Sequence, residues 1–169
     1  MITSETVQLA CSEVGQYTEE TMAREFERFF REQPDVCDFV AGITDQSDPT
    51  IRELSLFLSF MVFKAAEIGE SHTPAPVTAE TIESVYRESE TWIERISQAG
   101  PAELQQAVAA SFQTDTEPHL LHYVISELNE LHDGEELDDN AKGEVFFVLK
   151  TVISALASAT TGGITGESF

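Results

Sequence analysis

Apolar residues recur at helical spacing along almost the whole chain of 169 residues, and Pro and Gly fall between the periodic segments. A repeat of three or four residues places apolar side chains on one face of a helix, and no convincing run alternates with the period of two that strands require. The sequence therefore predicts an all-α fold, a helical bundle of about eight helices. We expect residues 1–159 to form a single compact domain and residues 160–169 to form a flexible tail.

Cap and stop residues define the first helices. The first is expected over about residues 4–16, the second from the cap Thr18 to Pro34, and a short third carries Val36 to Ile43. The second helix places several aromatic residues on one stripe, which predicts that this stripe faces the core. The stripe consists of Met22, Phe26, Phe29 and Phe30.

The fourth expected helix is the most apolar element of the chain. It begins at Asp48-Pro49, ends near Gly69, and contains the stretch 54–63, which is apolar on nearly all sides. Such a helix belongs in the centre of a bundle. The stretch is too short to cross a bilayer, which needs roughly 20 apolar residues, so we expect a buried helix and no membrane partner.

Residues 70–77 form the clearest linker, and four further helices are expected after it. Their starts are marked by the cap Thr78, by Pro101 after Gly100, by the cap Thr116, and by Asp138 or Asp139.

The segments on the two sides of this linker resemble each other, which favours two similar four-helix halves, residues 4–70 and 78–159. The motif Gln33-Pro34-x-Val36-x-x-Phe39-Val40 matches Glu117-Pro118-x-Leu120-x-x-Tyr123-Val124 at an offset of 84 residues, and other apolar positions match at an offset of 82. The alternative is that any two amphipathic helices align when they slide past each other, because they share the 3.6-residue period. A true duplication predicts a ligand site in the cleft between the halves.

Charge is the outlying feature of the composition. The chain has 31 Asp and Glu against 9 Lys and Arg, a formal net charge of −22, and residues 65–141 alone carry −15. Nucleic-acid binding is disfavoured, because phosphate contacts need Lys and Arg clustered on one face. The acidity points to a protein partner with a basic surface or to a cation, and adaptation to a salty cytoplasm is the alternative reading.

Two cysteines, Cys11 and Cys37, lie in apolar helical patterns without any C-x-x-C motif. We interpret them as small buried residues in a reducing compartment, and the absence of a signal peptide pattern at residues 1–5 leads us to expect a cytoplasmic protein.

His119 and His122 are the only candidate metal ligands that we single out. They are three residues apart near the start of one helix, so their side chains share a face, and Glu117 or a carboxylate from another helix is a candidate third ligand. The simpler interpretation is two exposed surface histidines. The acidic loop 133–144 does not fit an EF-hand, because Leu137 and Asp138 stand where an oxygen ligand and Gly are needed.

No catalytic residue and no cofactor is predicted, since the chain has no nucleophile elbow, no phosphate-binding loop and no Glu-x-x-His motif. We therefore expect a non-catalytic acidic helical module for protein interaction or regulation, which pairs with a basic partner or with itself as a homodimer. The alternative is a metal- or small-ligand-binding helical protein, with enzymatic activity as its extension, that uses His119 and His122 or the cleft between the halves. Mimicry of DNA by the acidic surface is a third hypothesis.

Overall fold

The protein is an all-α bundle in the computed structural model, which describes residues 2–97, 106, 117–130 and 139–162. No strand occurs in these ranges. The described helices are α1 (Ser4–Gly15), α2 (Glu19–Glu32), α3 (Pro34–Ile43), α4 (Pro49–Glu70), α5 (Ala79–Ser97), α7 (Pro118–Glu130) and α8 (Asp139–Gly162).

The predicted fold class is confirmed, and most of the predicted helix starts are observed. The side chains of Thr18, Asp48 and Thr78 each accept a hydrogen bond from a backbone N–H in the first turn of the helix that follows. The helix expected after Pro101 and the last seven residues of the expected tail lie outside the described residues. Helix α8 continues to Gly162, three residues into the segment expected to be tail.

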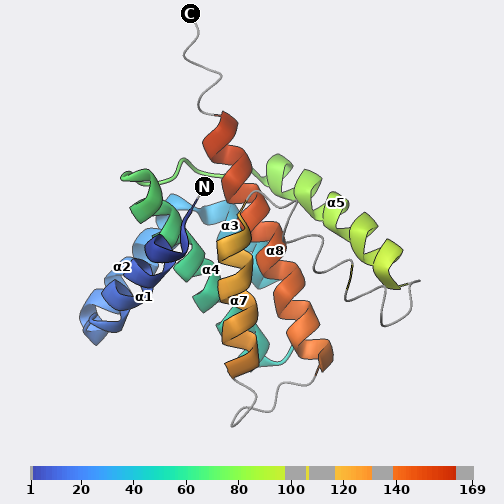
Figure 1. Ribbon diagram of the computed structural model, residues 1–169, viewed down its shortest axis with the longest axis horizontal. Helices are drawn as coiled ribbons and strands as arrows, with labels where there is room; N and C mark the ends of the chain where they lie inside the picture. The colour runs from blue at the N-terminus through green and yellow to red at the C-terminus, as the bar shows by residue number, and fades with distance from the viewer. Residues whose placement is uncertain (1, 98–105, 107–116, 131–138, 163–169) are drawn as a thin grey trace, which may run out of the picture.

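Helices α4 and α8 pack against each other, and the other helices pack around this pair (Figure 1). Helices α1 and α3 both pack on α4, and helices α5 and α7 both pack on α8. Helix α1 also lies beside α7, and α3 lies beside α5. In the view of Figure 1, α1 and α2 lie on one side of α7 and α8, and α5 lies on the other.

The central position predicted for the fourth helix is observed in α4. Residues 58–66 of this helix are all buried, and its Phe60 and Phe63 are completely enclosed. Phe29 of α2 packs against both rings, with centroid separations of 6.0 and 5.2 Å. Within the described helices, none combines the length and apolar character needed to cross a bilayer.

The aromatic stripe of α2 is buried only in part, which corrects the expectation for Phe30. Phe29 is buried, but Phe30 keeps 44% of its surface exposed. The two residues are adjacent in the helix and point about 100° apart, since an α-helix has 3.6 residues per turn. Phe30 therefore only reaches the edge of the core, where its ring lies 6.4 Å from that of Phe26.

A cluster of two cations and two carboxylates joins α2 to α4. This charge cluster consists of Glu25, Arg28, Lys64 and Glu67. Arg28 donates to both oxygens of Glu67 over 2.6 and 2.7 Å and to Glu25 over 2.8 Å. Lys64, whose side chain is 5% exposed, donates to Glu67 over 3.2 Å and to Glu25 over 3.4 Å. The forked Arg–carboxylate geometry is the strong form of such pairs.

The linker after α4 is held by one buried side chain, Gln33, which precedes α3. Its amide nitrogen donates to the carbonyl oxygens of Pro74 and Ala75 over 3.2 and 3.0 Å. Its amide oxygen accepts from the N–H of Val77 over 3.0 Å. The one amide group therefore satisfies three backbone groups and fixes the path of the chain into α5.

Acid should remove the stabilisation that the charge cluster gives. Burial by itself would raise the pKa of Glu67, but the hydrogen bonds from Arg28 and Lys64 outweigh it and lower the pKa from 4.5 to about 2. Because the folded-state pKa lies below the unfolded one, the ionised carboxylate contributes on the order of 3 kcal/mol above pH 4.5, and this is lost as the pH falls from about 4.5 through about 2. Urea unfolding of dilute protein, repeated at several pH values from 7 to 3, measures this loss of stability.

The matched comparison is Glu67→Gln against Glu53→Gln, an exposed position on the same helix. Glu67→Gln should lower stability at pH 7 and flatten its decline in acid, whereas Glu53→Gln should keep the decline of the natural chain. Equal slopes in all three proteins would show that Glu67 does not carry this part of the acid sensitivity.

Removing the Gln33 amide should destabilise the fold by about 2–4 kcal/mol, because Gln33→Ala leaves buried backbone groups unpaired and opens a cavity. Gln33→Glu keeps the shape but loses the donors to Pro74 and Ala75, so it should also be costly. Gln46→Ala, at an exposed position, should change stability by less than about 0.5 kcal/mol. Urea titrations of the three variants test this, and a Gln33→Ala protein as stable as the Gln46→Ala protein would refute it.

Candidate functional site

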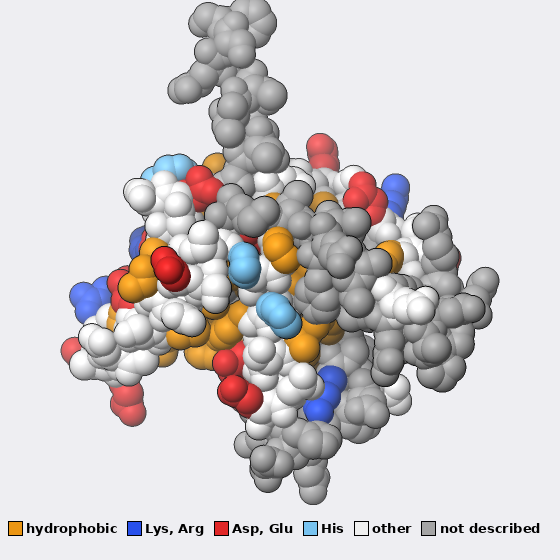
Figure 2. Space-filling view, in the orientation of Figure 1, with side chains coloured by type: hydrophobic (Ala, Val, Ile, Leu, Met, Phe, Trp, Pro, Cys, Tyr) orange, Lys and Arg blue, Asp and Glu red, His pale blue; other side chains and the backbone are white. Residues whose placement is uncertain are grey.

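Two hollows on the surface each lie between a helix of residues 4–70 and a helix of residues 78–159. We call them the α3/α5 groove and the α1/α7 groove, after the helices that line them. Both lie between the two segments that resemble each other in sequence, where a true duplication would predict a ligand site. Figure 2 shows His side chains exposed over α7, with acidic side chains further along this helix and apolar surface beside it.

The α3/α5 groove has a volume of about 550 Å³, an apolar floor and an acidic rim. The rings of Phe39 and Tyr86 meet edge to face on the floor, with centroids 5.8 Å apart. Tyr86 also contacts Phe147 of α8 at 5.3 Å, so the floor is fixed to the centre of the bundle. The full lining is Asp35, Asp38, Phe39, Ile43, Ala79, Ile82, Glu83 and Tyr86.

Three carboxylates form the rim of this groove. Asp38 and Glu83 are exposed and Asp35 is half-buried. Glu83 pairs with Arg87, one turn further along α5. Nothing in the described part of the chain pairs with Asp35 or Asp38 by a hydrogen bond or ion pair of the side chain. The rim is therefore a negative surface next to aromatic and aliphatic side chains, an arrangement that suits a group both basic and apolar.

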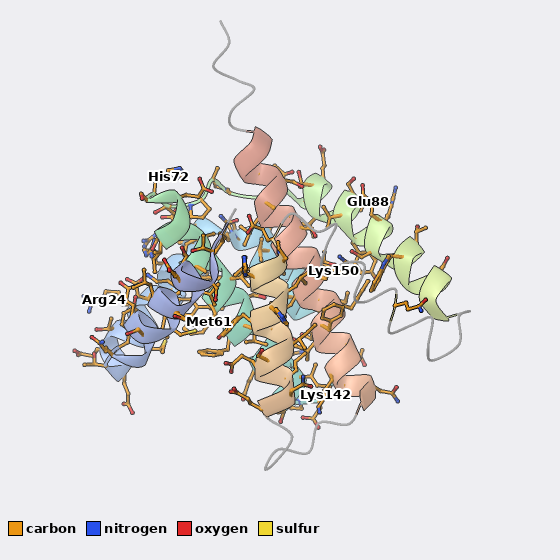
Figure 3. All side chains as sticks on the ribbon, in the orientation of Figure 1. Arg24, Met61, His72, Glu88, Lys142 and Lys150 are labelled. Atoms are coloured by element: carbon orange, nitrogen blue, oxygen red, sulfur yellow. The ribbon has the colours of Figure 1, made fainter. Side chains whose placement is uncertain are left out.

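Helix α5 is held against α8 beyond the groove as well. The ammonium of Lys150 lies over the ring of Trp92, 5.3 Å from its centroid. Figure 3 labels Lys150 on α8, and Glu88 on the middle of α5.

The α1/α7 groove has a volume of about 530 Å³ and a more varied lining. Cys11 and Tyr123 both line it, and burial raises the pKa of each. Burial and the neighbouring Glu130 raise the pKa of Glu127. The full lining is Ser4, Val7, Gln8, Cys11, His119, His122, Tyr123, Ser126, Glu127 and Glu130.

The structure places both histidines predicted as metal ligands in the α1/α7 groove. His119 and His122 are exposed on the first two turns of α7. Glu117, considered as a third ligand, instead accepts a hydrogen bond from the N–H of Ile2 over 2.8 Å. Within the described ranges, no three His, Cys, Asp or Glu side chains are placed to hold one metal ion. The metal site remains a prediction that rests on the two histidines.

His72 lies apart from both grooves, in the linker after α4, where its ring is exposed and within 3.1 Å of the carbonyl oxygen of Thr73 (Figure 3). His132 and residues 133–138 of the acidic loop lie outside the described residues, and residues 139–144 belong to α8.

Sequence reasoning missed the α3/α5 groove and the charge cluster. A signal for the cluster was present, since Lys64 directly follows the apolar stretch 54–63 of the most apolar helix, and a cation buried there needs carboxylate partners. The groove had no comparable signal, because Asp35 and Glu83 are far apart in sequence and look like ordinary surface acids.

Comparison with known protein families, with curated proteins and with solved structures finds no match to this chain.

Neither cysteine should behave as a reactive thiol in the folded protein. Burial raises the pKa of Cys37 to about 12, with a further contribution from Asp38. Burial also raises the pKa of Cys11, against the hydrogen bond from Tyr123. Since the thiolate is the reactive form, iodoacetamide at pH 8 should modify Cys37 at least about a hundredfold more slowly than in the urea-unfolded chain.

Peptide mass spectrometry over time resolves the two cysteines, with the unfolded chain as the control. Cys11, which is less buried, should react at an intermediate rate. Rapid alkylation of either cysteine in the folded protein would show a thiolate, and would reopen nucleophilic chemistry.

Proposed function

We propose that this protein is a non-catalytic acidic interaction module whose α3/α5 groove holds a basic amphipathic segment of a partner protein. The observation that carries the proposal is the combination of an apolar floor, formed by Phe39, Ile82 and Tyr86, with the carboxylates of Asp35 and Asp38 beside it. A segment with Leu or Phe side chains on one face and Lys or Arg at its edge complements both parts.

Charge over the whole molecule supports a basic partner. The net charge of −22 attracts a positive segment from a distance and raises the rate of encounter. Exposed carboxylates at the rim then set the register, while the apolar floor supplies most of the binding energy, as at other interfaces. Salt should therefore weaken binding without abolishing it, because it screens charges and leaves apolar contacts in place.

The second candidate function is binding of a metal or small ligand, with enzymatic activity as its extension. The observation that favours it is that His119 and His122 both line one hollow of about 530 Å³. A cytoplasmic location belongs to the main proposal, and the two free thiols, Cys11 and Cys37, fit a reducing compartment.

Binding of a model partner tests the main proposal. The probe is a fluorescein-labelled short peptide of Lys and Leu arranged so that a helix would carry Leu on one face. Fluorescence anisotropy gives its Kd in about 0.05 M and about 0.5 M NaCl. Asp35→Asn with Asp38→Asn should weaken binding roughly tenfold, since two rim charge pairs together contribute about 1–2 kcal/mol.

The control for this experiment is Glu27→Gln with Glu53→Gln, two exposed acids on α2 and α4. It changes the net charge by the same amount at a distance from the groove, so binding should stay within about twofold of the natural chain. Equal weakening by both double variants would mean that only the overall field attracts the probe. Absence of binding at low salt would refute the proposed function and direct attention to metal binding or self-association.

A further inference from the structure

Helices α1 and α5 begin with matching sequence and matching cap contacts. Residues 2–7 read Ile-Thr-Ser-Glu-Thr-Val and residues 77–82 read Val-Thr-Ala-Glu-Thr-Ile, an offset of 75. In each segment the N–H of the second threonine donates to the hydroxyl of the first over 3.2 Å, and the two hydroxyls lie 3.0 Å apart. The residue before the cap, Ile2 or Val77, is buried in both places.

This offset at the helix starts is compatible with the offset of 82 seen in the sequence further along. Helix α5 has 19 residues and α1 has 12, so α5 is longer by seven. Seven residues make about two turns of an α-helix. An extension of that length leaves the apolar face in the same direction, so α1 corresponds to α5 from either end.

The side chains that anchor these two starts also correspond. The side-chain oxygen of Gln33 accepts from the N–H of Val77, and that of Glu117 accepts from the N–H of Ile2. Gln33 and Glu117 each precede the proline that opens α3 or α7, at the offset of 84. Each half thus holds the first helix of the other half through the same position. Sliding of amphipathic helices accounts for matched apolar faces but not for this reciprocal contact.

Every residue that lines the α3/α5 groove has a counterpart in the lining of the α1/α7 groove. At the offset of 75, the pairs are Ala79 with Ser4, Ile82 with Val7, Glu83 with Gln8, and Tyr86 with Cys11. At the offset of 84, the pairs are Asp35 with His119, Asp38 with His122, Phe39 with Tyr123, and Ile43 with Glu127.

We propose that the chain is an internal duplication about a pseudo-twofold axis, and that the α1/α7 groove is a second docking site, for a less basic segment of the same partner. This inference rests on the proposed function of the α3/α5 groove. A duplication that places one docking groove between α3 and α5 places a second one between α7 and α1.

The chemistry of the second occupant follows from the pairs that differ. The floor keeps its apolar character, with Val7 in place of Ile82 and Tyr123 in place of Phe39. None of the three rim acids is kept. Their counterparts are the hydrogen-bonding side chains His119, His122 and Gln8.

Negative charge lies instead at one end of the α1/α7 groove, where Glu127 and Glu130 belong to the last turn of α7 and the turn before it. Glu127 is half-buried, and the charged group that acts on it is Glu130, which with burial raises its pKa. The segment that fits is amphipathic, with neutral polar side chains along its edge and a single Lys or Arg at the end that meets these two carboxylates.

Exchange of the differing residues tests the inference. The basic probe is the Lys and Leu peptide, and the neutral probe is the same peptide with Gln in place of every Lys but the last. Two-dimensional amide NMR of the full chain locates each probe. Binding at the α3/α5 groove shifts signals of α3 and α5, and binding at the α1/α7 groove shifts signals of α1 and α7. In the natural chain, the basic probe should bind at the α3/α5 groove, and the neutral probe should prefer the α1/α7 groove.

The decisive variant is His119→Asp with His122→Asp, which gives the second groove the rim of the first. It should gain a second site for the basic probe, with affinity at the α1/α7 groove raised roughly tenfold. Its control, Gln46→Asp with His72→Asp, makes the same charge change at exposed positions that line neither groove, and it should gain no site at the α1/α7 groove.

The outcomes separate the two proposals. In one outcome the basic probe binds the α3/α5 groove, the neutral probe does not bind the α1/α7 groove, and the His119→Asp, His122→Asp variant gains no site there. The second site is then refuted and the proposed function stands. If the basic probe binds neither groove of the natural chain, both proposals are overturned.

Discussion

Lys64 lies within nine consecutive buried residues of α4, where an unpaired ammonium would cost several kcal/mol. Its burial is compatible with folding because Glu25 and Glu67 lie against it and Arg28 balances the second carboxylate. Helix α2 must therefore dock on α4 in one register, with the fork of Arg28 facing Glu67. Phe29 packs on Phe60 and Phe63 in that same register, so charge and apolar contacts support the same arrangement.

The enclosed centre determines where the surface is hollow. Since α4 and α8 fill the middle of the bundle, the shorter helices of the two halves pack around them and meet in the pairs α1 with α7 and α3 with α5. The grooves form along these seams. The charge cluster also holds two of the nine Lys and Arg residues and two of the 31 acids of the chain, which leaves seven cations against 29 acids elsewhere. A groove with an acidic rim is a consequence of this distribution, and its aromatic floor is what makes it more than a solvated acidic surface.

The elements that the sequence predicted best are those that depend on neighbours within one or two turns. The caps at Thr18, Asp48 and Thr78, and the buried character of α4, follow from local hydrogen bonding and from an unbroken apolar pattern. Phe30 was placed wrongly because a stripe of four apolar residues spans a wider arc than the core contact of α2. Placement of His119 and His122 on one side of a helix was likewise a local inference, and both do line one groove. A third ligand would have to come from another helix, which no local pattern reports.

The sequence by itself determined the described helices, most of their starts, the central role of α4 and the excess of negative charge, because these depend on residue types at short spacing. Only the tertiary structure decided which helices meet. Arg28 and Glu67 are separated by 39 positions, and Gln33 and Val77 by 44. The helical period is the same in every amphipathic segment, so it tells which face is buried and not what it is buried against. That choice is made by pairing of buried polar groups and by the shapes of the packed faces, and it places the acidic rim of α3 beside the aromatic face of α5.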